Sequence, residues 1–335
     1  MELIAEIGQA HDGSWGQLVS MVDVLCGLPV DTIKLQHHIA AAESSESEQF
    51  RVKFSQQDKT RYDYWQRMEL PFEILRDVKQ LVESRGKRFL CTAFSLQALD
   101  DLEKLGVDRY KIGSADVSNG LLLRRIAETG RPVIVSNGLR DFAAMAKALE
   151  TLRGGQDDIV IMHCTSAYPT PLESVNLGEI DVLRERFGLP VGLSDHSGSI
   201  WPSTFALAHG AVASEFHFVW DRRQFGPDSS SSLVASDIEL LGEAVRAWHL
   251  THANRLDDSV ERSLRTVAAT FSRSVRVRRD IKAGDTLCLS HLECFKPGGL
   301  GISAGDAAEL LGKRSSVRIA AGSIFSEAHR DMFRD

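Results

Sequence analysis

Two apolar stretches of the sequence end in clusters of residues that could hold a metal ion. The stretch VGLSDHSGSI, residues 191–200, contains Asp195 and His196, and ASEFHFVWD, residues 213–221, contains Glu215 and His217. Capped strand ends with incidental polar residues would explain either stretch alone. Two histidines at the ends of neighbouring strands, beside carboxylates, suit a divalent transition metal or Mn²⁺. We therefore predict that His196 and His217 are metal ligands, whereas His163 is a core or orienting residue.

Two lysines lie inside apolar, strand-like runs and predict an anion site. Lys34 belongs to TIKLQH and Lys111 to RYKIGS. A lysine is costly to bury without a partner, so each needs a reason to be there. One alone could form a structural ion pair, but two of them with several hydroxyls suit a phosphate or carboxylate. The hydroxyl residues at the ends of this and other runs are Thr92, Ser114, Ser136 and Ser194.

Eight short apolar runs alternate with amphipathic segments over the first part of the chain. The runs are LIAEIG, TIKLQH, RFLCTAF, RYKIGS, PVIVSNG, IVIMHC, VGLSDH and ASEFHF. Apolar strands that alternate with helices indicate a parallel sheet covered on both faces. Eight such units in about 250 residues predict an α/β fold of the (β/α)8 TIM-barrel type, with a doubly wound open sheet as the alternative. In a barrel, all the strand-end residues named above meet at one face.

The rest of the chain supplies a long insertion and a second domain. Residues 40–70 are polar before the aromatic RYDYW, and a loop of that length at a strand end is typical of a lid. We assign residues 1–250 to the barrel, the polar residues 251–262 to a linker, and residues 263–335, with short strands and glycine turns, to a small β-rich domain.

Composition limits the partners and the compartment. The formal net charge of −7 argues against nucleic acid or an anionic membrane as a main partner. No apolar run approaches the ~18 residues of a membrane span, and the N-terminus has no signal-peptide pattern, so we expect a cytoplasmic protein. The five cysteines form no CxxC pair and are expected to be reduced thiols: Cys26, Cys91, Cys164, Cys288 and Cys294.

Several motifs together resemble the sialic acid synthase family, which includes pseudaminic and legionaminic acid synthases. They are AEIGQAHDGS, IKLQ, YDYWQRMEL, YKIGS, VSNG, HCTSAYPTPLESVNL, GLSDHS and GPD. The segment RDIKAGDTLCLSHLECFKPGGLGIS resembles the C-terminal SAF (antifreeze-like) domain of that family. The resemblance implies a transferase that condenses phosphoenolpyruvate with N-acetylmannosamine or a related N-acyl sugar, giving a nonulosonate and phosphate.

The resemblance also implies roles for individual residues. Phosphoenolpyruvate would be held by Lys34, Thr92, Lys111, Ser114, Ser136 and Ser194, and the metal by His196 and His217. We expect Mn²⁺, with Mg²⁺ and Co²⁺ as alternatives. The sugar side would comprise Gln36, Asp116, Ser166, Tyr168, Asp228 and Lys296. The family further implies a domain-swapped homodimer, in which each SAF domain covers the barrel mouth of the partner.

This sequence departs from the family pattern mainly on the sugar side. KIGSAD stands where KIGSGE is usual, so that Asp116 is shorter than the usual glutamate. Ser166 replaces an asparagine, HFV stands where HFT is usual, and Lys296 takes the place of the arginine of the SAF domain. These changes leave the phosphoenolpyruvate residues intact and leave the identity of the sugar open.

The sequence leaves more than one candidate for the general base and more than one for the reaction class. A carboxylate must activate the water that traps the intermediate, and Glu6, Glu215 and, less well placed, Asp195 are the candidates. A metal-dependent barrel hydrolase or phosphatase would also use strand-end histidines and carboxylates, but it does not need two strand lysines with a ring of hydroxyls. A non-catalytic sugar-binding protein would need no metal pair.

Overall fold

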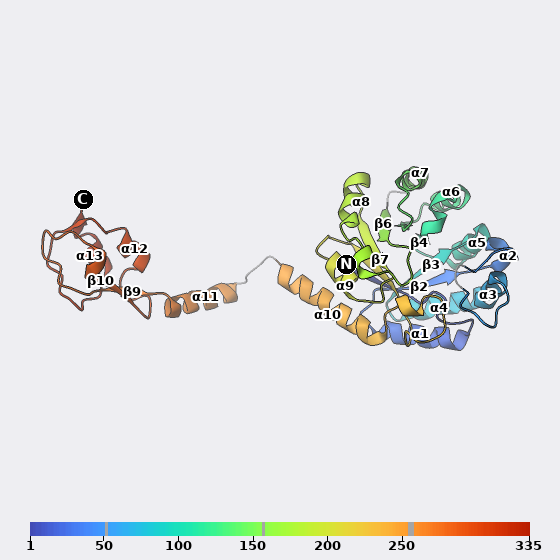
Figure 1. Ribbon diagram of the computed structural model, residues 1–335, viewed down its shortest axis with the longest axis horizontal. Coiled ribbons are helices and arrows are strands. Elements are labelled where there is room, and N and C mark those ends of the chain that lie inside the picture. The colour runs from blue at the N-terminus through green and yellow to red at the C-terminus, as the bar shows by residue number, and fades with distance from the viewer. Residues whose placement is uncertain (51–52, 156–157, 254–257) are drawn as a thin grey trace. The chain divides into compact units, whose positions relative to one another are not determined.

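The computed structural model describes residues 1–50, 53–155, 158–253 and 258–335 in two compact units (Figure 1). The first unit covers Met1–His252 and the second Ala253–Asp335. Each unit is described by itself below.

Eight parallel strands close into a barrel in the first unit. Strand β8 pairs with β1, with Ile4 opposite Glu215 and Glu6 opposite His217, so the sheet has no free edge. This closure confirms the TIM barrel over an open sheet. The strands are β1 (Glu2–Glu6), β2 (Thr32–His37), β3 (Arg88–Ala93), β4 (Tyr110–Ile112), β5 (Val133–Asn137), β6 (Ile159–Cys164), β7 (Val191–Asp195) and β8 (Ala213–His217).

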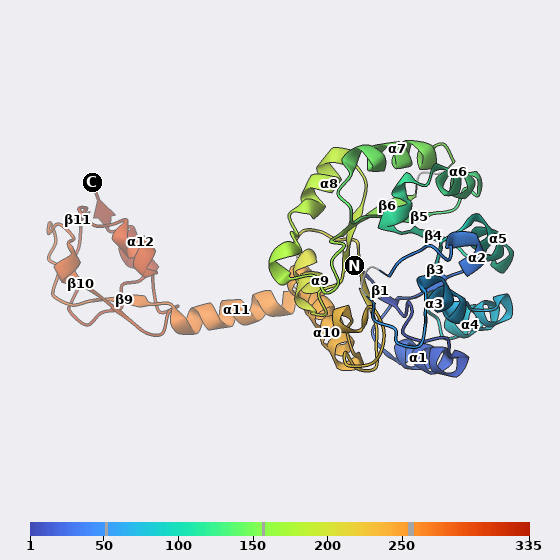
Figure 2. The same ribbon diagram turned by 45° about the vertical axis from the view of Figure 1, so that its right-hand side comes forward.

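Helices form a ring around the strands (Figure 2). Their apolar faces pack against the outer face of the sheet and form the main core with it. The helices are α1 (Trp15–Gly27), α4 (Phe72–Ser84), α5 (Leu96–Leu105), α6 (Gly120–Glu128), α7 (Phe142–Arg153), α8 (Glu179–Phe187), α9 (Trp201–Ala206) and α10 (Ala235–His252), with short 3₁₀ turns η1 (Ser114–Ser118), η2 (Leu172–Ser174) and η3 (Ser229–Ser231).

A separate apolar layer fills the inside of the barrel and supports the polar residues above it. Its buried members are Ile4, Leu90, Ile134, Met162 and Ala213, one from each of five strands. Side chains on a strand alternate between the two faces, so the residue two positions further along also points inward. The layer directly above this apolar floor therefore consists of Glu6, Thr92, Ser136, Cys164 and Glu215.

The insertion at residues 40–70 folds into two helices, α2 (Ala40–Glu43) and α3 (Arg61–Met68). The side chain of Thr60 caps α3 and accepts a hydrogen bond from the backbone N–H of Asp63. The carboxylate of Asp63 in turn accepts one from the backbone N–H of Thr60. Tyr64, Trp65 and Met68 are buried in an apolar cluster. The guanidinium of Arg67 pairs with Asp58 at 2.7 Å and with Asp12 in the loop after β1. The contact with Asp12 fixes the insertion to the barrel.

The second unit has a small core of its own. Helix α11 (Asp258–Phe271) precedes two antiparallel pairs, β9 (Ser274–Val277) with β10 (Leu292–Phe295) and β11 (Arg314–Ser315) with β12 (Phe333–Arg334). Helices α12 (Ala304–Ala308) and α13 (Glu327–Arg330) complete it. The β-rich domain is as expected, but part of the expected linker is helical: α10 extends to His252, and residues 258–262 form the start of α11. Residues 254–257 of that linker lie outside the described residues.

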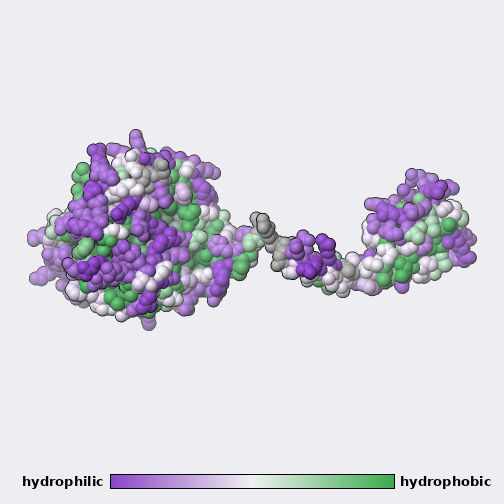
Figure 3. All heavy atoms as spheres, turned by 180° about the vertical axis from the view of Figure 1, so that it is seen from behind, coloured by the Kyte–Doolittle hydropathy of each residue, from purple (hydrophilic) through white to green (hydrophobic). Residues whose placement is uncertain are grey.

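The face of the barrel unit shown in Figure 3 is mainly hydrophilic, with scattered apolar residues. Among the helices of the described residues, none is both long and apolar enough to pass through a lipid bilayer. All five cysteines are free thiols.

Candidate active site

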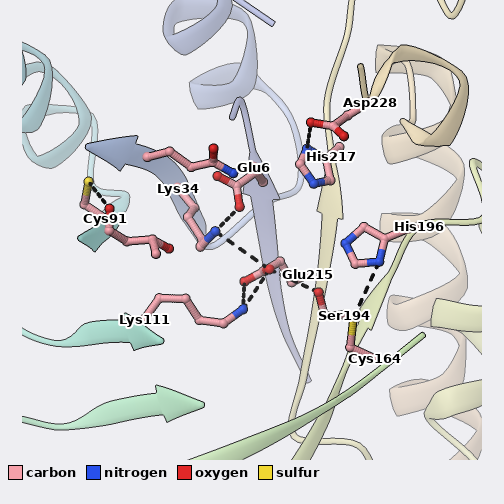
Figure 4. Close-up of polar contacts among 12 residues, drawn as sticks. Glu6, Lys34, Cys91, Lys111, Cys164, Ser194, His196, Glu215, His217 and Asp228 are labelled. Atoms are coloured by element: carbon pink, nitrogen blue, oxygen red, sulfur yellow. Dashed lines mark hydrogen bonds and ion pairs between the residues drawn. The ribbon is translucent and has the colours of Figure 1, made fainter. Parts of the chain in front are cut away.

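Four charged side chains converge inside the mouth of the barrel (Figure 4). Lys111 Nζ lies 2.8 Å from each carboxylate oxygen of Glu215, and Lys34 Nζ lies 3.8 Å from Glu215 Oε1. Lys34 also donates a hydrogen bond to Glu6 Oε2. We call Glu6, Lys34, Lys111 and Glu215 the Lys–Glu quartet. Two ammonium groups and two carboxylates thus face one another at the ends of β1, β2, β4 and β8.

Burial and mutual attraction set the charges of the quartet. All four side chains are buried. Burial alone would raise the pKa of Glu215, but the charges of Lys111 and Lys34 outweigh it and hold that pKa well below its ordinary value. Burial lowers the pKa of Lys34 to about 8, despite the attraction of Glu215. One oxygen of Glu6, Oε1, is buried and has no hydrogen-bond partner among the described residues.

Hydroxyl groups surround the quartet, as the sequence predicted. The hydroxyl of Ser194 donates to Glu215 Oε1 at 3.1 Å. Thr92 and Ser136, whose side chains alternate onto the inner face, are both buried in the same layer. The backbone N–H of Gly138 donates to Ser114 Oγ at 2.9 Å. The site therefore offers neutral donors beside two ammonium groups, which is what an anion with several oxygen atoms requires.

Gly138 leaves the space that two hydroxyls require, that of Ser114 at the anion site and that of Ser166 on the predicted sugar side. A Cβ atom on Gly138 would lie 2.4 Å from Ser114 Oγ, 2.4 Å from Ser166 Oγ and 3.1 Å from Cys164 Sγ. The two hydroxyls thus face each other across the α-carbon of a glycine. Any larger residue would force both hydroxyls to rotate away.

We expect Gly138→Ala to weaken binding of the anionic substrate by about tenfold, because hydrogen bonds to a charged group contribute about 1.5–3 kcal/mol each. The protein should stay folded, because serine side chains can rotate. Gly113→Ala is the matched control, since a Cβ there meets nothing within 4 Å. Substrate-dependence curves for both variants check this, and equal behaviour would contradict the assignment of the Ser114–Ser166 cradle.

The two predicted metal ligands lie next to each other on β7 and β8. The ring centroids of His196 and His217 are 5.5 Å apart. Burial and the charge of His217 lower the pKa of His196 to about 3, and burial and the charge of Lys34 lower the pKa of His217 to about 3. Both imidazoles are therefore neutral, which is the form that binds a metal. His196 Nε2 lies 3.1 Å from the hydroxyl of Tyr168, and His196 Nδ1 lies 3.6 Å from Cys164 Sγ.

Two imidazoles are fewer than the four protein ligands of a structural metal site. His217 Nδ1 lies 4.0 Å from Asp228 Oδ2. Within the described residues, no group of three or more histidine, cysteine, aspartate or glutamate side chains is arranged to hold a metal ion. A divalent ion on the two histidines would thus keep several coordination positions for water or substrate, as catalytic sites do.

Three of the residues expected on the sugar side, Gln36, Tyr168 and Asp228, lie near the histidine pair. Gln36 Oε1 accepts a hydrogen bond from Gln9 Nε2 at 2.9 Å. Burial raises the pKa of Asp116, although a hydrogen bond from Asn119 at 3.1 Å opposes it. Tyr168 and Asp228 each lie beside one of the two histidines. The structure therefore gathers Gln36, Tyr168 and Asp228 around the histidine pair, and it places Ser166 at the cradle described above.

Three candidates lie elsewhere. Asp195 follows the inward-facing Ser194, so it points to the outer face, where it accepts two hydrogen bonds from Ser197 at 2.7 and 3.2 Å. That position corrects the idea that Asp195 reaches the reacting atoms. His163 also faces outward, and its Nε2 lies 2.6 Å from Val175 O, in keeping with an orienting role. Lys296 belongs to the second unit, where its Nζ lies 5.1 Å from the ring centre of Phe271.

The sequence reading missed two contributors to the site. Cys164 was predicted only to be a reduced thiol, yet it lies beside His196, and burial raises the pKa of its thiol to about 11. Its parity on β6, two residues after Met162 on the inner face, is a signal that could have found it. Gln9 lies in the quoted motif AEIGQAHDGS, but its contact with Gln36 depends on how the loop after β1 folds.

Comparisons with known proteins place the chain in a family. The NeuB family model matches residues 21–255, and the SAF domain model matches residues 272–329. The chain is 29% identical to N,N'-diacetyllegionaminic acid synthase of Legionella pneumophila over 98% of this chain and 94% of that protein. It is 28% identical to pseudaminic acid synthase of Campylobacter jejuni over 97% and 95% of the two chains. A crystal structure of N-acetylneuraminic acid synthetase from Leptospira borgpetersenii, in complex with citrate, superposes with a TM-score of 0.68 at 25% identity, covering 79% of this chain and 90% of that one.

Proposed function

The chain belongs to the NeuB family, and we propose that it condenses phosphoenolpyruvate with an N-acyl hexosamine-type aldose to give a nonulosonate and phosphate. The observation that carries this proposal is the Lys–Glu quartet with its hydroxyl ring, directly beside a neutral histidine pair. The names of the relatives support the same product class.

Phosphoenolpyruvate fits the quartet because it carries two anionic groups. Lys34 and Lys111 each neutralise one of them, so that the phosphate and the carboxylate no longer repel each other inside the barrel. Thr92, Ser114, Ser136 and Ser194 donate hydrogen bonds to the remaining oxygens. These contacts fix which face of the alkene points to the acceptor sugar.

The acceptor aldose occupies the side of the site that the lid covers. Gln36, Tyr168 and Asp228 bind its polar groups near the two histidines, and Asp116 and Ser166 complete this side. A divalent ion, with Mn²⁺ preferred over Mg²⁺ and Co²⁺, would be held by His196 and His217. When it is bound, it supplies Lewis-acid polarisation of the aldehyde oxygen.

The chemical step forms a carbon–carbon bond between the two substrates. The enol carbon C3 attacks the aldehyde carbon, and water adds to the cation that develops at C2. The resulting tetrahedral intermediate expels phosphate by cleavage of its C–O bond. Glu6 is favoured as the base for this water over Glu215, because Glu6 Oε1 has no partner among the described residues whereas Lys111 and Ser194 engage Glu215.

A phosphate-release assay tests the function. Purified full-length protein is supplied with phosphoenolpyruvate, a panel of N-acyl aldoses and a divalent metal, and we expect phosphate release that depends on both an aldose and the metal. Release without any sugar would instead indicate a phosphatase. Absence of release across the panel, with sugar binding retained, would indicate a binding protein.

The SAF domain is proposed to act on the barrel of a second copy in a domain-swapped homodimer. Lys296 then contributes a point charge to the sugar side, where a lysine offers no bidentate fork. In such a dimer, each site combines a barrel and a tail from different chains.

Mixing two inactive variants is expected to restore activity if the tails are exchanged. Lys296→Ala damages only the tail contribution, and His217→Ala damages only the barrel. In a randomised equal mixture about half the dimers are mixed, and each has one intact site, so about a quarter of wild-type activity should return. A fully active monomer in solution, or no recovery after subunit exchange, would contradict the swapped arrangement.

A further inference from the structure

His38 has no role in any of the sequence motifs. Its imidazole lies between Glu43, in the insertion at residues 40–70, and Gln36 on the predicted sugar side. His38 directly follows β2 and is only 3% exposed. Its ring stacks on Trp65 of α3, with centroids 4.3 Å apart and planes at 21°, and on Phe94 on the other side, at 4.5 Å and 10°. Two aromatic faces therefore prevent the ring from tilting or leaving its plane.

Both nitrogens of this ring face oxygen atoms. His38 Nδ1 lies 2.7 Å from Glu43 Oε1, at the end of lid helix α2. His38 Nε2 lies 2.9 Å from Gln36 Oε1. Both oxygens can accept a hydrogen bond, so an N–H group on each ring nitrogen would satisfy this arrangement.

These bonds determine which end of the Gln36 amide is available. Gln36 Oε1 accepts from both His38 and Gln9, so its two lone pairs are engaged. The amide nitrogen points the other way: a Cβ atom on Gly8 would lie 3.5 Å from Gln36 Nε2 and 3.2 Å from His217 Nδ1. Gln36 thus presents its N–H donors on the side of the histidine pair.

We propose that His38 is a positioning residue that, together with Glu43, fixes the Gln36 amide with its donors toward the acceptor sugar. The group it recognises is then an oxygen that accepts a hydrogen bond, a hydroxyl or carbonyl of the aldose. Glu43 and Trp65 both come from the insertion at residues 40–70, so an ordered lid and a correctly oriented Gln36 form together. The identity of the ligand rests on the proposed function, whereas the orientation of Gln36 does not.

Kinetics on single and double variants test this role. His38→Phe keeps an aromatic ring between Trp65 and Phe94 but removes both hydrogen bonds, and Glu43→Gln removes the charge. Both should raise the KM for the aldose about tenfold, the effect of roughly one lost hydrogen bond, with the KM for phosphoenolpyruvate unchanged. In a Gln36→Ala background, His38→Phe should have no further effect on the aldose KM, since the residue acts through Gln36.

The neighbouring His37 provides the matched control. His37 is equally buried but faces Asp101 of α5, with its Nε2 at 3.3 Å. His37→Phe should leave the aldose KM unchanged even if it lowers stability. Additive effects of His38→Phe and Gln36→Ala, or an equal rise in both substrate KM values, would overturn the positioning role.

A spectroscopic measurement separates this role from the proposed reaction. In the full-length protein labelled with ¹⁵N at histidine, Gln36→Ala should shift the Nε2 resonance of His38 and leave that of His37 in place. An unchanged His38 resonance would overturn the contact whether or not any sugar is turned over. If the wild-type protein releases no phosphate with any aldose, but Gln36→Ala still shifts the His38 resonance, only the proposed function is contradicted.

Discussion

Replacing His217 with alanine is expected to reduce turnover by about 10³-fold or more while the barrel stays folded. The loss follows because His217 is one of the two proposed ligands of a divalent ion that would polarise the aldehyde. That contribution amounts to several kcal/mol, and each 1.36 kcal/mol corresponds to a factor of ten in rate. His196→Ala should behave alike, since both imidazoles are buried and neutral.

Metal content and thermal unfolding complete this test. Both variants should lose bound divalent metal and keep a cooperative unfolding transition. His209→Ala serves as the control, because that histidine bonds Asp181 on the surface, with its Nδ1 at 2.6 Å. Near-normal activity of the wild type in the presence of a strong chelator would remove the metal from the mechanism.

The second large effect is expected at the lysines of the quartet. Lys34→Ala or Lys111→Ala should raise the KM for phosphoenolpyruvate about ten- to hundredfold, because a charge-assisted hydrogen bond contributes about 1.5–3 kcal/mol. The KM for the aldose should change much less. Steady-state kinetics with each substrate varied in turn measure the split. Lys104→Ala, at a lysine that pairs with Asp101 on the surface at 2.9 Å, is the control.

The Lys111→Ala variant carries a further signature in its stability. Glu215 would lose its nearest cation and remain buried, which raises its pKa in the folded state above the unfolded value. A carboxylate of this kind favours the folded state below its unfolded pKa and destabilises it as the pH rises. The variant should therefore be most impaired at neutral pH and recover toward acidic pH. Unchanged phosphoenolpyruvate dependence in both lysine variants would mean that the anion site lies elsewhere.

The sequence predicted the barrel and most of the site because both depend on local periodicity. Alternating apolar runs and amphipathic segments specify the strands and helices, and the common direction of the strands brings Lys34, Lys111, His196 and His217 together. The parity of side chains along a strand is equally local. It separates Ser194, which bonds Glu215, from Asp195, which faces outward. The choice of Asp195 as a candidate base could therefore have been avoided.

Other features depend on contacts that periodicity does not encode. The chain of bonds from Glu43 through His38 to Gln36 exists because α3 folds back over the barrel, which the polar composition of residues 40–70 does not reveal. The segment at residues 251–262 looked like a linker because it is polar. Its C-terminal residues nevertheless begin helix α11, in which Val260, Leu264, Val267 and Phe271 recur at helical spacing.

The Lys–Glu quartet requires an anionic ligand to displace ion pairs that already exist within the protein. Because two ammonium groups already face two carboxylates, the pocket has no excess positive charge with which to attract stray anions. An incoming ligand must take over existing ion pairs, and a ligand with one anionic group would satisfy one lysine while it deprives a buried carboxylate of its cation. A ligand with two anionic groups can engage both lysines at once. Inorganic phosphate, the product of the proposed reaction, has only one anionic group, so we expect it to compete weakly for this site.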